Sequence, residues 1–136
     1  MTNVLFICKN NMFRSKVAES FFNKINTNKK NKSRSAGIIG NQGRYYNKNV
    51  ANDYGVICKG SPTQINHDDL VWADIVVITA NNIPKKIFKI DPNNINFHYK
   101  LIKWKIQDVY DHDKKRIDKT LKILWKKVNK LVNHLN

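Results

Sequence analysis

The feature that most constrains this chain is a short apolar run that ends in a cysteine and is followed by a polar loop. Residues 4–7 are apolar and flanked by polar residues, a pattern typical of a buried strand. Cys8 follows, and after the loop 9–13 come Arg14 and Ser15, which open a segment with helical periodicity. Serine is a common helix N-cap, so we predict that Cys8 lies where a strand ends and a helix capped by Ser15 begins.

Such a strand-to-helix junction is suited to binding an anion. Backbone N–H groups converge there, and the positive end of the helix dipole favours bound phosphate and the thiolate form of a cysteine. Arg14 can place its planar guanidinium over the same anion. A cysteine at a strand end is more often a small core residue, but Cys8, Arg14 and a helix start in immediate succession favour a catalytic, phosphate-binding loop.

The composition indicates one domain without a metal or disulfide framework. The chain has 136 residues, enough for a single domain over 1–136 with a substantial core. Two cysteines, Cys8 and Cys58, and four scattered histidines give neither a disulfide framework nor zinc spacing. Because we find no membrane-spanning apolar run and no signal-peptide pattern, we expect a cytoplasmic protein with no membrane partner, metal or cofactor. Cys58 is expected to be structural.

Positive charge is the second strong signal. The chain carries 25 Lys and Arg against 10 Asp and Glu, a formal net charge of +15. This charge admits an acidic partner bound through a basic surface. The lysine-rich connection 28–32 has no interleaved aromatic residues and no nucleic-acid motif, so we expect no nucleic-acid partner. A solvated lysine-rich surface is the simpler interpretation.

Strands and helices are predicted to alternate along the whole chain, without internal repeats. Apolar periodicity predicts helices over 15–26, 46–54 and 113–134, with shorter ones beginning at Asn66 and Pro84. Strands are predicted over 4–8, 33–38, 74–79 and 96–101. This alternation predicts an α/β three-layer sandwich, an open parallel sheet with helices on both faces. Ligands in such folds bind beyond the carboxyl ends of strands, where Cys8 lies.

A thiolate beside a bound phosphate can attack phosphorus, but the leaving group then needs a proton from an acid. The polar loop before the last helix offers three candidates, Asp108, Asp111 and Asp113. Asp113 is also placed to cap that helix. Tyr110 can form an aromatic wall for a phenyl substrate, or it can simply pack.

Several segments together resemble the low-molecular-weight protein tyrosine phosphatases. The resemblance runs nearly end to end and is carried by residues 4–8 with Asn11, Arg14-Ser15 and Ala18-Glu19, by Ser33-Arg34-Ser35-Ala36-Gly37, by 73–77, and by Asp108-Val109-Tyr110. It implies a four-stranded parallel sheet, with strand order 2-1-3-4, flanked by helices. It also implies hydrolysis of phosphorylated proteins or aryl phosphates through a cysteinyl-phosphate.

The resemblance implies a role for each matching residue. Cys8 would be the nucleophile, Arg14 the phosphate clamp and Asp108 the general acid and then base. Ser15 would hydrogen-bond the sulfur, Asn11 would hold the loop shape, and Ser35 would support Asn11. The substrate-binding set would be Lys9, Asn10, Asn11, Met12, Phe13, Ser15 and Tyr110.

Several positions depart from the family pattern, among them four near the candidate site residues or their supporting network. Asn10 replaces a glycine of the loop, although asparagine tolerates positive φ better than most residues. Phe13 replaces the loop's second cysteine, Val109 replaces the proline after the acid, and Gly60 stands where some members have a histidine. These departures allow three alternatives: a protein-arginine phosphatase, an arsenate reductase, and a non-catalytic member that binds phosphorylated or polyanionic partners. Apolar Met12 resembles the loop of the tyrosine-directed members more than that of the arginine-directed ones, and Cys58 offers a poor relay for arsenate reduction.

Overall fold

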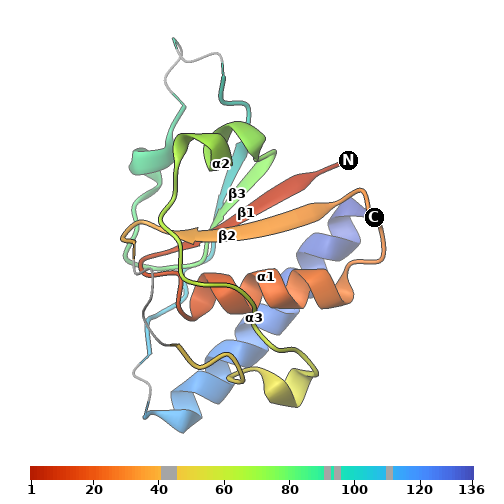
Figure 1. Cartoon of the computed structure of the whole chain (residues 1–136), viewed down its shortest axis with the longest axis vertical. Coiled ribbons are helices and arrows are strands. Elements are labelled where there is room, and N and C mark those ends of the chain that lie inside the picture. Colours follow the sequence, from red (N-terminus) through yellow and green to blue (C-terminus); the bar gives the residue numbers. More distant parts are fainter. Residues whose placement is uncertain (41–45, 91–92, 94–95, 110–111) are drawn as a thin grey trace.

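The computed structural model describes residues 1–40, 46–90, 93, 96–109 and 112–136. Four strands form one parallel sheet with the order β2-β1-β3-β4, and helices cover both of its faces (Figure 1). The strands are β1 (Asn3–Cys8), β2 (Lys32–Gly37), β3 (Ile75–Ile78) and β4 (Lys100–Lys103). The helices are α1 (Arg14–Ile25), α2 (His67–Trp72) and α3 (Lys114–Leu135), with the 3₁₀ turns η1 (Asn52–Tyr54) and η2 (Lys85–Phe88). The predicted fold class and strand order are confirmed.

Strand β1 divides the core between the two faces of the sheet, because successive strand side chains point to opposite sides. Val4 and Phe6 pack with α1 and α3, whereas Leu5 and Ile7 pack on the side of α2 and η2. All four side chains are fully buried. Of the described residues, no helix is long and apolar enough to cross a membrane.

Three predicted elements differ from the structure. The helix expected over 46–54 is only the 3₁₀ turn η1, because asparagine side chains compete for the backbone: the Asn47 carboxamide accepts the N–H of Asn49 at 3.0 Å. The helix expected from Pro84 is likewise the single turn η2. The fourth strand begins at Lys100, where pairing with β3 starts, and not at residue 96.

The helix starts predicted at Asn66 and at the beginning of 113–134 are confirmed by side-chain caps. Asn66 and Asp69 form a capping box at the start of α2. Asp113 accepts the N–H of Arg116 at 3.2 Å, so it caps α3. Capping thus accounts for one of the three candidate acids, and Asp111 lies outside the described residues.

Candidate active site

Cys8 is buried at the end of β1, and two groups contact its sulfur. The backbone N–H of Asn11 donates to Cys8 Sγ at 3.1 Å, and Ser15 Oγ lies 2.9 Å from the same sulfur. The side-chain amide of Asn11 donates to Ser15 Oγ at 2.8 Å, which leaves the serine's own proton available to the sulfur. This arrangement is suited to a thiolate, which accepts hydrogen bonds and donates none.

Ser15 does not cap α1, contrary to the sequence prediction. The helix begins at Arg14, and its N-cap position is Phe13, which makes no side-chain capping bond. Ser15 lies inside the first turn, where it is fully buried and its hydroxyl faces Cys8 and Asn11. The serine therefore serves the loop and not the helix end.

Asn11 holds the loop in an unusual backbone conformation. Its φ of 55° lies in the left-handed region, which asparagine tolerates better than most residues, and it is fully buried. Its side-chain oxygen accepts the backbone N–H of Thr63 at 3.0 Å, from a segment 52 residues away. The positive φ considered for Asn10 is found at Asn11 instead.

Ser35 is linked to Asn11 through Thr63, and its supporting role stays a prediction. The Ser35 hydroxyl donates to Glu19 Oε1 at 2.7 Å, and the Ser35 carbonyl accepts from Thr63 Oγ1 at 3.3 Å. Thr63, which sequence reasoning missed, donates to the side-chain oxygen of Asn11. The backbone N–H of Thr63 makes a shorter hydrogen bond to Asn11 than its hydroxyl does, so the type of side chain at this position gives little indication of the contact.

Gly37 allows the end of β2 to pass close to the loop. A Cβ at this position would lie 2.9 Å from the Lys9 oxygen, from the Asn10 carbonyl carbon and from the Asn11 nitrogen. Because all three are backbone atoms, they cannot move away cheaply. The glycine of the family-like segment 33–37 is thus required by close packing.

Arg14 connects the loop to the chain after β4. Its side chain is only 3% exposed. Nη1 donates to the carbonyl of Ile106 at 3.0 Å, and Nη2 lies 3.8 Å from Asp108 Oδ2. The Asp108 side chain is 58% exposed, so it can reach a ligand from solvent.

A cavity of about 430 Å³ brings the three predicted catalytic residues together. Cys8, Arg14 and Asp108 all line it. The other lining residues are Asn10, Met12 and Phe13 of the loop and, unassigned from the sequence, Tyr46, Asn47, Val50, Val109 and Ile117. Lys9 is exposed and is not a lining residue, and Tyr110 lies outside the described residues.

Two further observations bear on the chemistry. Cys58 is buried and does not line the cavity. Burial raises the pKa of its thiol, while the hydrogen bond with Ser20 and the charge of Lys16 act in the opposite direction. This agrees with its predicted structural role. Within the described ranges, no three His, Cys, Asp or Glu side chains are grouped so that they could hold a metal ion.

The family model described as low molecular weight phosphotyrosine protein phosphatase matches residues 3–136. The chain belongs to this family. The predicted resemblance is thereby confirmed over nearly the whole chain. A search of curated protein sequences gives no significant match.

Solved structures of proteins with several different activities share the fold of this family member. The low molecular weight protein tyrosine phosphatase from T. tengcongensis has a TM-score of 0.82 at 23% identity, covering 98% of this chain and 99% of that one. The arginine phosphatase from Geobacillus stearothermophilus gives 0.79 at 18%, covering 99% and 93%. The arsenate reductase from Archaeoglobus fulgidus gives 0.72 at 24%, covering 96% and 98%. At these identities the likeness shows the fold and leaves the substrate open.

Proposed function

We propose that this phosphatase hydrolyses phosphotyrosine in proteins through a cysteinyl-phosphate intermediate. The observation that carries the proposal is the shared cavity of Cys8, Arg14 and Asp108. A nucleophile, a cation and an exposed carboxyl on one cavity are the groups that metal-free phosphate transfer requires.

In the first step, the Cys8 thiolate attacks phosphorus and the bond from phosphorus to the leaving oxygen breaks. That oxygen takes a proton from the Asp108 carboxyl. The Arg14 guanidinium and the loop amides hold the other phosphate oxygens while charge redistributes among them. The hydrogen bonds from Asn11 and Ser15 direct the sulfur before attack.

In the second step, water attacks the phosphorus of the cysteinyl-phosphate and the sulfur–phosphorus bond breaks. The Asp108 carboxylate takes a proton from this water, which restores the acid for the next cycle. The departing sulfur regains its negative charge, and the Ser15 hydroxyl, 2.9 Å away, can donate to it. Phosphate then leaves and Cys8 is again a thiolate.

The walls of the cavity favour an aryl leaving group over a guanidinium. Met12, Tyr46, Val50 and Ile117 all line it and contribute apolar surface, against which a phenyl ring can pack. The Tyr46 hydroxyl donates to the Gly60 carbonyl at 2.6 Å, which holds its ring in place. An arsenate reductase would need a second thiol near Cys8, and Cys58 is outside the cavity.

The first test replaces the nucleophile. Cys8→Ser should abolish phosphate release from phosphotyrosyl peptides and from aryl phosphates, whereas Cys58→Ser serves as the matched control and should retain it. Phosphoseryl and phosphoarginyl peptides, assayed in parallel, define the substrate class. Hydrolysis that survives in Cys8→Ser would exclude the cysteinyl-phosphate mechanism, and preference for phosphoarginine would move the assignment to an arginine phosphatase.

The second test concerns the acid. Asp108→Asn should lower kcat by roughly 10²–10⁴-fold for phenyl phosphate, because the phenolate then leaves without a proton. The loss should be much smaller for an aryl phosphate with an acidic phenol, which leaves readily as the anion. An equal loss for both leaving groups would show that Asp108 is not the acid.

A further inference from the structure

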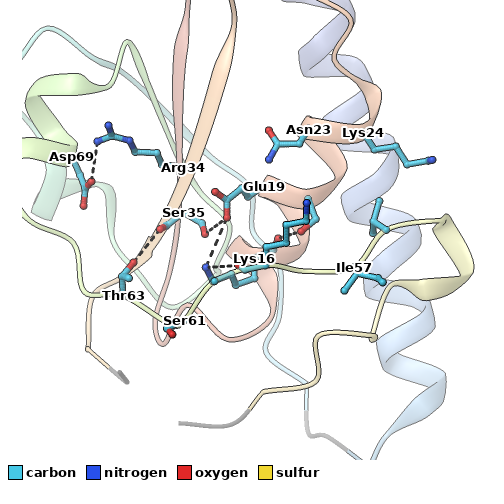
Figure 2. Close-up of a pocket in the computed structure, with 14 residues that line it drawn as sticks. Lys16, Glu19, Asn23, Lys24, Arg34, Ser35, Ile57, Ser61, Thr63 and Asp69 are labelled. Carbon is cyan, nitrogen blue, oxygen red and sulfur yellow. Dashed lines mark hydrogen bonds and ion pairs between the residues drawn. The ribbon is translucent and has the colours of Figure 1, made fainter. Parts of the chain in front are cut away.

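A second cavity, of about 650 Å³, lies beside β2 and α1 (Figure 2). It is bounded by α1, by β2 and by the segment 56–63, and it shares no lining residue with the cavity at Cys8. Its lining residues include Lys16, Glu19, Lys24, Arg34, Ser35, Lys59, Thr63 and Asp69. Nothing in the proposed phosphate transfer uses this cavity.

Strand β2 is an edge strand whose outer backbone groups are only partly paired. The backbone N–H groups of Lys32 and Ile38 point toward β1 and donate to Thr2 and Cys8. Because successive backbone groups of a strand point to opposite sides, those of Ser33, Ser35 and Gly37 point away from β1. Gly37 already pairs there, donating to Thr63 and accepting from Ile65. In the described part of the chain, the N–H groups of Ser33 and Ser35 have no such backbone partner.

A buried ammonium lies beside this open edge. Lys16 is only 5% exposed, and its Nζ donates to the Lys59 carbonyl at 3.1 Å, with Glu19 Oε1 4.0 Å away. An ammonium has three donors, so this one retains capacity for another acceptor. Figure 2 shows Lys16 between Glu19 and Ser61, in the middle of the cavity.

On balance, the charged side chains around the cavity are positive. Asp69 pairs with Arg34 at 3.5 Å and Glu19 pairs with Lys16 at 4.0 Å, so each of the two carboxylates is matched by one cation. Lys24 and Lys59 also line the cavity and add positive charge to it. The site therefore combines outward backbone groups, a buried cation and a basic surround.

We propose that this cavity binds an acidic, extended polypeptide segment, which adds to the outer edge of β2 and directs a carboxylate side chain toward Lys16. Strand addition supplies main-chain hydrogen bonds at Ser33 and Ser35, and side chains at alternate positions supply selectivity. The side chains of Ser33 and Ser35 bond Asn23 and Glu19 on α1, so this strand face looks onto the cavity. The proposal goes beyond the phosphatase reaction and does not depend on it.

The experiment titrates the labelled protein with an unphosphorylated, end-blocked hexapeptide that alternates glutamate with valine. NMR shifts and amide exchange should show binding, with new protection at Ser33 and Ser35. The same peptide with lysine in place of glutamate should not bind. Cys8→Ser should bind the acidic peptide as the wild type does, which separates this site from the catalytic proposal.

Ser33→Pro tests the edge directly, because it removes an outward N–H and no hydrogen bond of the sheet. Its matched control is Ser33→Ala, which loses only the side-chain bond to Asn23. Proline should weaken binding roughly fivefold relative to alanine, the value of one net hydrogen bond. Lys16→Met should weaken it as well, and thermal unfolding verifies that each variant is folded.

Three results would overturn the proposal. The first is that the acidic peptide does not bind at millimolar concentration, or binds no better than the lysine peptide. The second is that Ser33→Pro and Ser33→Ala bind equally. The third is that the shifts and the protection fall outside β2 and α1.

Discussion

Replacing Asn11 with alanine should lower the free energy of unfolding by about 3 kcal/mol. Two hydrogen bonds are lost, one to Ser15 at 2.8 Å and one from Thr63 at 3.0 Å, each with a net value of about 1 kcal/mol. Alanine at a φ of 55° adds a further cost of about 1 kcal/mol, because the short polar side chain of asparagine makes the left-handed region tolerable and alanine has no such group. The two hydrogen bonds and the backbone contribution together give the expected loss of about 3 kcal/mol.

The matched variant is Asn11→Gly, which separates the two causes. Glycine loses the same two hydrogen bonds but adopts positive φ without strain, so the expected loss is about 2 kcal/mol. Urea unfolding of the three proteins, analysed with a common m-value, measures both differences. Both variants should also lower kcat toward an aryl phosphate, since Ser15 loses the donor that orients it toward Cys8.

Two outcomes would refute this reasoning. If alanine and glycine destabilise the protein equally, the left-handed backbone stores no strain at this position. If both variants stay within about 0.5 kcal/mol of the wild type, the change is that of an ordinary surface position, and the hydrogen bonds of Asn11 do not hold the loop.

Two further predictions concern residues around the loop. Gly37→Ala should lower the free energy of unfolding by about 1–3 kcal/mol and reduce activity, because its Cβ would lie 2.9 Å from three backbone atoms of residues 9–11. The control is Gly40→Ala, whose Cβ would meet the Gln64 side chain. Equal stability of the two variants in urea would contradict the packing argument. Burial raises the pKa of Glu19 above 4.5, against the effects of the Ser35 hydrogen bond and of Lys16. The folded state therefore holds this proton more tightly than the unfolded state does. The stability of the wild type relative to Glu19→Gln should fall as the pH rises from about 4.5 through the folded pKa, and should then level off. If the stabilities of the two proteins change in parallel with pH, the pKa of Glu19 is not raised by folding.

The regular elements could be predicted because burial imposes a clear period on the sequence. β1, β2, β3, α1 and α3 lie within one residue of their predicted ends. The region 46–54 misled the prediction because its apolar spacing is helical, whereas its asparagines favour local turns. Apolar periodicity indicates which side chains are buried, but it does not indicate where side chains compete for backbone hydrogen bonds.

The candidate site was predictable only where side-chain type carries the signal. Cys8, Arg14 and Asp108 form a recognisable pattern, and the structure places them on one cavity. The contacts from Ile106 and Thr63 use backbone groups, which every residue except proline offers, so the sequence gives little sign of them. Their positions follow from the packing of the whole sheet.

The hydrogen bond from Arg14 to the carbonyl of Ile106 spans 92 positions in the sequence. Closing so long a loop costs chain entropy, and folds rich in such long-range contacts fold slowly. β3 and β4 both lie between Arg14 and Ile106 in the sequence, so we expect the Arg14 side chain to gain its acceptor only when the sheet is complete. During refolding, the recovery of activity should therefore lag behind the recovery of helical signal, and a fragment that ends before β4 should contain Cys8 and yet remain inactive.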